Sequence, residues 1–319
     1  MADFTPVVTA CGLTKSFVGA DGEHIEALSD LTLSMPPNVI VSLVGVDGAG
    51  KTTFMRHITG LMKADSGELS VLGINPATDS QAVQDRISYL PQAFGLYEDL
   101  SVSENLDLYA DLHGVPEAKR KERYPELLAM ADLARYLDRP AGKLSGGMKQ
   151  KLGLICSLVR TPDLLLLDEP TAGVDPTARR DFWDELHELA ARGISVLVST
   201  HYMDEAERCH KLAYIAYGRL MATGTADEVI AGQGLTTLAV YGPDLSALQT
   251  KLRKTPGVEQ TVMFGTVLHA SARDAAALEK AVTSCLGADC RMEPISTGLE
   301  DVFIYMMAHS QDNFGSAKK

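Results

Sequence analysis

The sequence is poor in cysteine, in aromatic residues and in positive charge. Its 319 residues include five cysteines, with no C-x-x-C pair and no histidine at zinc-ligand spacing, so we expect reduced thiols and no zinc site. The formal net charge of −13 opposes nonspecific binding to nucleic acid or anionic lipid, and no nucleic-acid partner is expected. One basic cluster lies in a predicted helix among glutamates, and we interpret it as a solvated helix face: Lys119, Arg120, Lys121 and Arg123.

Long apolar runs are also missing. The run at residues 164–167, like every other uninterrupted apolar run of the sequence, is far shorter than the roughly 20 residues that span a bilayer. The N-terminus does not resemble a signal peptide, because Asp3 and Pro6 interrupt a stretch that has no basic region. We therefore do not expect the chain to cross a membrane unaided.

Short apolar runs bounded by turn residues do recur, at residues 39–44, 87–90, 164–167 and 194–198. Such runs between helical patterns predict buried, largely parallel strands of an α/β domain. A mostly helical stretch predicts a helical insertion at about residues 93–160. Beyond residue 234 the expected order is β-α-β-β-α-β, typical of a small ferredoxin-like α+β domain. We predict a large domain at 1–234, an accessory domain at 235–309 and a disordered tail at 310–319.

The segment after the first strand matches G-x-x-x-x-G-K-[ST], the pattern of a phosphate-binding loop. Its glycines let backbone N–H groups surround a phosphate, and the following helix N-terminus adds positive potential. Lys51 is expected to neutralise the β and γ oxygens of a triphosphate, and the Thr52 hydroxyl to bind Mg²⁺. The alternative is a glycine-rich turn without chemical function. The predicted ATP-binding residues of this segment are Gly45, Val46, Asp47, Gly48, Ala49, Gly50, Lys51, Thr52 and Thr53.

Two acids end the apolar strand at residues 164–167, where a parallel sheet opens onto its ligand crevice. Asp168 is expected to hold the magnesium shell, and Glu169 to orient and polarise the attacking water. Alone, the pair could equally be an ordinary strand end or a helix cap. Its occurrence together with the phosphate loop favours catalysis.

A third segment, Ser145, Gly146 and Gly147, precedes a predicted helix. Ser145 can be a simple N-cap, the commonest use of a serine at this place. The two glycines also leave the helix N-terminus open to an anion. In a dimer arranged head to tail, this second anion site would meet the γ-phosphate held by the partner subunit and give two composite sites.

These segments together resemble the nucleotide-binding subunits of ATP-binding cassette (ABC) transporters over about residues 7–232. The resemblance implies a P-loop NTPase cassette with a helical subdomain, and it implies roles for four more residues. Phe17 would stack on adenine, Gln92 would sense Mg²⁺ and the membrane partner, Asp175 would cross the dimer interface, and His201 would contact the γ-phosphate. Taken singly, each has a plainer interpretation as core, turn, helix cap or satisfied loop histidine.

Within the family, the stretch after His201 and the C-terminal Leu-Glu-Asp-Val-Phe resemble the ABC-2 type exporter branch, and other segments resemble bacterial multidrug efflux ATPases. The resemblance implies an ATPase on the cytoplasmic face of the inner membrane, with a separate ABC-2 permease and, in some systems, a periplasmic adaptor. The competing interpretations are a soluble ABC ATPase acting on ribosomes or another non-transport partner, and a nucleotide-binding regulator that never turns over.

The stretch after Gln92 carries Phe94, Leu96 and Tyr97 ahead of an acidic pair. A cluster of apolar side chains in a loop is typical of a partner site, and the resemblance places the permease here. The alternative is that these side chains fold inward and fix the helical insertion to the sheet. The C-terminal domain shows no catalytic constellation, and His269 on a probable strand is interpreted as a packing residue.

Overall fold

The computed structural model describes residues 4–19, 22–92 and 95–310, and the chain forms two compact units, Met1–Ala222 and Thr223–Gln311. Helix α8 (Ala226–Gln233) lies in the second unit because it packs against α11 (Leu299–Ala308). The boundary between the two units therefore falls before α8, whereas the sequence pattern placed the domain boundary after residue 234. Of the predicted tail, residues 311–319 lie outside the described part of the chain.

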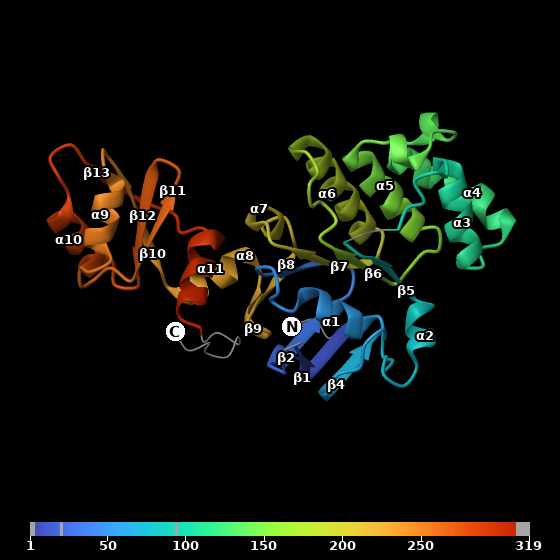
Figure 1. Ribbon diagram of the computed structural model, residues 1–319, viewed down its shortest axis with the longest axis horizontal. Helices are drawn as coiled ribbons and strands as arrows, with labels where there is room; N and C mark the ends of the chain where they lie inside the picture. Colours follow the sequence, from blue (N-terminus) through green and yellow to red (C-terminus); the bar gives the residue numbers. More distant parts are fainter. Residues whose placement is uncertain (1–3, 20–21, 93–94, 311–319) are drawn as a thin grey trace. The chain divides into compact units, whose positions relative to one another are not determined.

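A six-stranded sheet forms the centre of the first unit, with strand order β5-β6-β7-β3-β8-β9 (Figure 1). The pairs β5–β6, β6–β7, β7–β3 and β3–β8 are parallel, which confirms the four predicted parallel strands. The strands span Ile40–Val44 (β3), Ile87–Leu90 (β5), Leu164–Asp168 (β6), Ser195–Thr200 (β7), Lys211–Ala216 (β8) and Arg219–Gly224 (β9).

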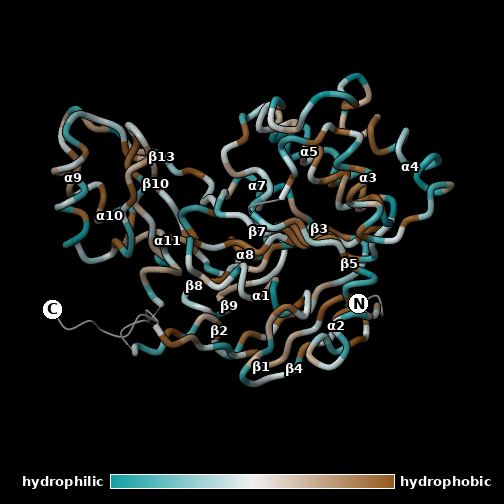
Figure 2. Tube along the Cα trace, turned by 45° about the vertical axis from the view of Figure 1, so that its right-hand side comes forward, coloured by the Kyte–Doolittle hydropathy of each residue, from teal (hydrophilic) through white to brown (hydrophobic). Residues whose placement is uncertain are grey.

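Both faces of this sheet are buried, because successive side chains along a strand point to opposite sides. On β6, Leu164 and Leu166 pack with α1 (Lys51–Ile58) and the N-terminal strands, while Leu165 and Leu167 pack with helices on the other face. Figure 2 shows the apolar character of β3 and β7 in the same sheet. Burial on both faces explains why these strands read as continuous apolar runs.

A second sheet of the first unit was not predicted. It is antiparallel, has the order β2-β1-β4, and is built from Val8–Val18 (β1), His24–Met35 (β2) and Ser66–Val71 (β4). Register shifts around Gly12 and Leu13 break the strict alternation by which a half-buried strand is recognised. Helix α2 (Ser80–Gln84) leads from this sheet into β5.

The predicted helical insertion is present as α3 (Val102–Leu112), α4 (Glu117–Met130), two short 3₁₀ turns at Ala134–Tyr136 and Ala141–Lys143, and α5 (Gly146–Ser157). Helix α3 begins with a capping box, in which Ser101 and Glu104 satisfy each other's backbone N–H groups. After β6 the chain forms α6 (Pro176–Ala191), and after β7 the short α7 (Met203–Ala206). Within the described residues, no helix has the length and apolar character needed to cross a bilayer.

The second unit contains a four-stranded antiparallel sheet of order β11-β12-β10-β13. Its order along the chain is the predicted β-α-β-β-α-β: Thr236–Tyr241 (β10), Leu245–Leu252 (α9), Gln260–Phe264 (β11), Val267–Ala272 (β12), Ala275–Cys285 (α10) and Arg291–Ile295 (β13). His269 lies on β12 as expected, and its Nδ1 is 3.1 Å from Oδ1 of buried Asp301 on α11. The sequence did not reveal this pairing across 32 residues.

Candidate functional site

The phosphate loop joins β3 to α1 and folds around its own lysine. Gly50 is the N-cap of α1 at φ 108°, and a Cβ there would lie 2.4 Å from the carbonyl oxygen of Ala27, so only glycine fits. Lys51 Nζ donates to the carbonyls of Gly45 at 2.7 Å and Val46 at 3.1 Å. This buried ammonium and the N-terminus of α1 are two sources of positive potential in one place.

A cavity of about 310 Å³ opens over this loop. The loop supplies most of its walls, and the opposite wall carries Gln92 and Glu169 from the loops after β5 and β6. The lining residues are Ala27, Asp47, Gly48, Ala49, Gly50, Lys51, Thr52, Thr53, Gln92 and Glu169. Seven of the nine loop residues expected from the sequence to bind ATP therefore line one pocket together with Glu169, whereas Gly45 and Val46 are not among its lining residues.

Asp168 is buried and accepts three hydrogen bonds. Thr52 Oγ1 donates to Oδ2 at 2.8 Å, Ser199 Oγ donates to Oδ1 at 2.6 Å, and Tyr89 OH lies 3.3 Å from Oδ2. The pKa of the Tyr89 phenol is raised to about 12, mainly by burial and secondly by the negative charge of Asp168. Tyr89 therefore remains a hydrogen-bond donor at neutral pH. The Thr52 hydroxyl and the Asp168 carboxylate, the two predicted Mg²⁺ ligands, thus meet, and their binding of Mg²⁺ stays a prediction.

Glu169 has a backbone φ of 49°, in the left-handed region that non-glycine residues rarely occupy. Its N–H donates to Ser199 Oγ at 2.9 Å, which holds this conformation. The carboxylate forms an ion pair with Lys51 at 3.2 Å and accepts from Gln92 Nε2 at 3.1 Å. Strained backbone of this kind persists at functional sites because the surroundings fix it.

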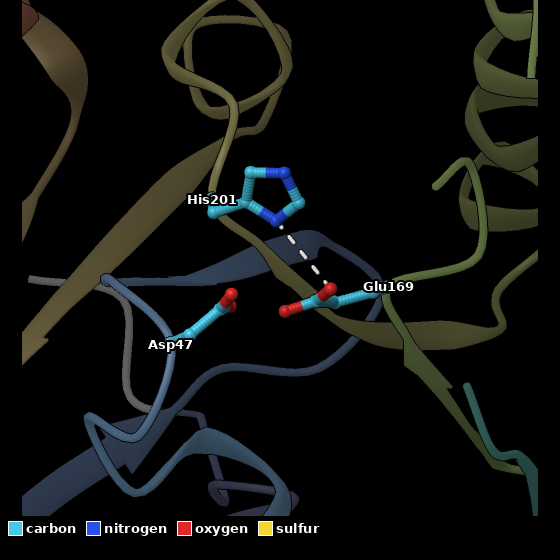
Figure 3. Close-up of side chains that lie close together, drawn as sticks. All are labelled: Asp47, Glu169 and His201. Atoms are coloured by element: carbon cyan, nitrogen blue, oxygen red, sulfur yellow. Dashed lines mark ion pairs between the residues drawn. The ribbon is translucent and has the colours of Figure 1, made fainter. Parts of the chain in front are cut away.

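Asp47, Glu169 and His201 converge at the mouth of the loop, with ligand atoms within 4.8 Å of one another (Figure 3). His201 Nδ1 lies 3.4 Å from Glu169 Oε2, an ion-pair distance without hydrogen-bond geometry. The His201 ring stacks at a tilt on Tyr202, with ring centroids 4.1 Å apart. Two carboxylates and an imidazole with an unpartnered nitrogen form a polar group that can receive a ligand.

The remaining predicted residues do not line this cavity. Ser145 is the N-cap of α5 and accepts from Met148 N–H, and Asp175 is the N-cap of α6 and accepts from Thr177 and Ala178 N–H. Phe17, on β1, exposes 39% of its surface. Within the single chain, Ser145 and Asp175 fulfil the plainer role of helix caps, and a role in nucleotide binding stays a prediction.

Two residues of the site were missed from the sequence. Ser199 reaches Asp168 because the two residues are Cα partners across β6 and β7. Tyr89 reaches Asp168 because β5 is the other neighbour of β6. Both contacts depend on strand order. The available signal was weak, because β5 also carries Ser88 and β7 also carries Ser195 and Thr200, so neither site residue is the one polar side chain of its strand.

Comparison with known proteins agrees with this geometry. A family model described as ABC transporter matches residues 28–172. A probable multidrug ABC transporter ATP-binding protein, YbhF, of Escherichia coli (strain K12) is 44% identical over 262 residues, which are 81% of this chain and 45% of the relative. This chain thus spans less than half of that protein.

A second relative and a solved structure match over most of their own length. The Nod factor export ATP-binding protein I of Ralstonia nicotianae is 38% identical over 272 residues, covering 85% of this chain and 83% of the relative. The dimeric structure of a post-hydrolysis state of an ATP-binding cassette bound to ADP and Pi is 26% identical, with a TM-score of 0.62 over 68% of this chain and 98% of that one. With the phosphate loop, the Asp168–Glu169 strand end and the cavity between them, these matches show that the chain belongs to the ATP-binding proteins of ABC transporters.

Proposed function

We propose that this chain is the ATP-hydrolysing subunit of an exporter, coupling ATP-driven dimer closure to movement in a separate ABC-2 permease. The observation that carries the proposal is the convergence of Lys51, Gln92 and Glu169 on one cavity beside His201. Export is supported by the names of the relatives, one of a multidrug ABC transporter and one of Nod factor export. Neither name points to a ribosome or another non-transport partner. The proposed location is the cytoplasmic face of the inner membrane, as a peripheral subunit.

The donor set suits MgATP. The hydroxyl of Thr52 and the carboxylate of Asp168 are oxygen ligands of the kind that Mg²⁺ prefers, and both are already oriented by hydrogen bonds. When bound, Mg²⁺ would neutralise charge on the β and γ phosphate oxygens. The Gln92 amide donates to Glu169 and not to Asp168. We therefore propose that Gln92 influences the metal site through its contact with Glu169, the water-activating residue.

Lys51 and Glu169 would change partners when ATP enters. Here their 3.2 Å ion pair is buried, with side chains 5% and 9% exposed. A triphosphate would compete for the ammonium, and loss of that partner would free the carboxylate to accept a proton from the attacking water. The hydrogen bond from the Gln92 amide would keep the Glu169 carboxylate oriented after Lys51 has left it. His201 would bind the γ-phosphate from the opposite side, and Phe17 would stack on adenine.

The second half of each site is proposed to come from another copy of the chain. Gly146 at the start of α5 is exposed and has open space around it, so a partner's phosphate can approach the helix N-terminus. Asp175 at the start of α6 would lie in the same interface. Support comes from the similar cassette that is a dimer bound to ADP and Pi.

A second cavity, of about 270 Å³, is the proposed docking groove for the permease. Leu61, after α1, lines it and is 66% exposed, and Leu112, which directly precedes the lining residue His113 in the chain, is 68% exposed. Tyr89 also lines this groove while its hydroxyl bonds Asp168, so one side chain connects the groove to the metal ligand. Exposed apolar clusters are typical of partner sites, and the occupant proposed is a short cytoplasmic helix of the permease.

The stretch after Gln92, which the sequence analysis proposed as the permease site, is only partly exposed. Leu96 packs against the helical core, in line with the inward-folding alternative, whereas Tyr97 is 56% exposed. Phe94 lies outside the described residues. We therefore place the permease mainly on Leu61 and Leu112, with Tyr97 at the rim.

Co-purification tests this proposal directly. The chain would be expressed with the membrane protein of about six spans expected beside its gene, and Leu61→Glu compared with Phe4→Glu, a control at another exposed apolar residue. We expect wild type and Phe4→Glu to co-purify with the permease and Leu61→Glu to lose it, with the melting temperature unchanged. Retention of the permease by Leu61→Glu would show that the partner docks elsewhere.

A further inference from the structure

One buried carboxylate of the first unit has no role in the site described above. Glu205 lies on α7, directly after β7, and is 1% exposed. A buried carboxylate is costly unless hydrogen bonds and an opposite charge compensate it. The partners of Glu205 therefore indicate what this position does.

Both carboxylate oxygens have partners, and the partners come from three different segments. Thr200 Oγ1 donates to Oε2 at 2.6 Å, and Thr171 Oγ1 donates to Oε1. Arg179 Nε, from α6, lies 3.5 Å from Oε1, and its guanidinium stacks on the Tyr202 ring at 4.2 Å. The two threonine side chains are each 1% exposed, so neither hydroxyl has water as an alternative partner.

The three partners of Glu205 lie close in sequence to residues of the nucleotide site. Thr171 follows Glu169 by two residues, Thr200 directly precedes His201, and Arg179 stands one turn after the α6 cap Asp175. The carboxylate thus joins the loops that carry the water-activating residue, the γ-phosphate histidine and the interface aspartate. Glu205 itself does not line the nucleotide cavity.

We propose that Glu205 is a positioning residue for ATP hydrolysis, fixing the Glu169 and His201 loops relative to each other through the hydroxyls of Thr171 and Thr200. The inference rests on the catalytic roles proposed for Glu169 and His201. Their 3.4 Å separation depends on two loops that leave the neighbouring strands β6 and β7, which also meet through Ser199, and small misplacements of catalytic groups cost large factors in rate. ATP affinity should not depend on Glu205, because none of the residues that contact its carboxylate belongs to the phosphate loop.

A purely structural role makes a different prediction. If the network only stabilises the fold, its loss lowers the melting temperature and leaves kcat of the folded protein unchanged. If it positions the two loops, kcat falls while the Kd for ATP stays constant. The split between kcat and Kd therefore separates the two roles.

The variants are Glu205→Gln, Thr171→Val and Thr200→Val, measured for ATP turnover and ATP binding in the full chain. Valine keeps the shape of threonine and removes only the hydroxyl. Asp301→Asn is the matched control, since it also converts a buried carboxylate with one basic partner to an amide, but in the second unit. We expect each of these three variants to lose about 10-fold in kcat, with the Kd for ATP changed less than about threefold. Turnover of Asp301→Asn should stay within twofold of wild type.

A second measurement identifies the residue through which Glu205 acts. In a Glu169→Gln background the same threonine substitutions should lower the residual turnover by less than about twofold, because residues that act as a unit are not additive. Full turnover by Glu169→Gln alone would overturn the proposed function. Two results would overturn only the role of Glu205. The first is loss of turnover in Glu169→Gln with wild-type kcat in Glu205→Gln, Thr171→Val and Thr200→Val. The second is a full further loss of about 10-fold when either threonine substitution is added to Glu169→Gln.

Discussion

Gly146→Asp is the perturbation that separates folding from function most clearly. Gly146 is the first residue of α5, it is exposed, and a Cβ built on it meets only the carbonyl oxygen of Gly173, at 4.0 Å. The neighbouring Gly147 is unsuitable, since a Cβ there would lie 2.6 Å from the Cβ of Ala178 on α6. Overpacking of that kind costs about 1 to 3 kcal/mol of stability and would obscure any effect on function.

The two effects of an aspartate at Gly146 have opposite signs. A carboxylate in the first turn of a helix interacts favourably with the helix dipole by about 0.3 to 1 kcal/mol, so the free energy of unfolding should rise slightly. The same carboxylate would repel a phosphate arriving from a partner subunit. Two unit charges about 4 Å apart at an effective dielectric constant near 20 interact by about 4 kcal/mol, which is a factor of about 10³ in dimer affinity.

The assay combines a melting curve, an ATP titration of the monomer and phosphate release. We expect an unchanged or raised melting temperature, wild-type ATP affinity and no hydrolysis, while Gly146→Asn, of the same size without the charge, retains most turnover. Loss of ATP affinity in the monomer would mean that α5 contacts nucleotide in its own subunit. Hydrolysis at the wild-type rate would refute a composite site.

Four further outcomes are expected. Lys51→Ala should abolish ATP binding in a titration, because its ammonium is the buried cation of the phosphate loop; near wild-type affinity would contradict its assignment. Glu169→Gln should keep ATP affinity and slow turnover by about 10² to 10⁴ fold, the usual contribution of a general base; normal turnover would require another residue to orient the water. Tyr89→Phe should leave the pH profile of turnover unchanged up to about pH 10, since the raised pKa keeps the phenol protonated throughout; loss of an inflection below pH 9 would refute that. Tyr97→Glu should leave the melting temperature unchanged, because 56% of this residue is exposed, and weaken co-purification with the permease; a fall in melting temperature would make the residue structural.

The phosphate loop and the two acids at the end of β6 could be predicted because their chemistry is contiguous in sequence. The loop needs only glycines, Lys51 and Thr52 in order after a strand, and the structure keeps that order around one cavity. The parallel strands were equally accessible, since burial on both faces leaves an uninterrupted apolar run.

The parts that escaped prediction depend on contacts between distant segments. Ser199 meets Asp168 through the neighbouring position of β6 and β7, which no local pattern encodes. Glu205 has three partners on three separate segments, and its sequence neighbourhood resembles an ordinary exposed helix start. The β1 and β2 strands were missed because bulges near Gly12 disturb their alternation.

We propose that two copies of the chain close on ATP, each supplying the helix N-terminus that completes the other's site. The most direct test is the molar mass of Glu169→Gln in solution with MgATP, measured by sedimentation, beside the Glu169→Gln, Gly146→Asp double variant. We predict a dimer for the first, and a monomer for the second and for Glu169→Gln without nucleotide. If Glu169→Gln stayed monomeric while saturated with ATP, or if the double variant dimerised equally well, the composite site would be contradicted.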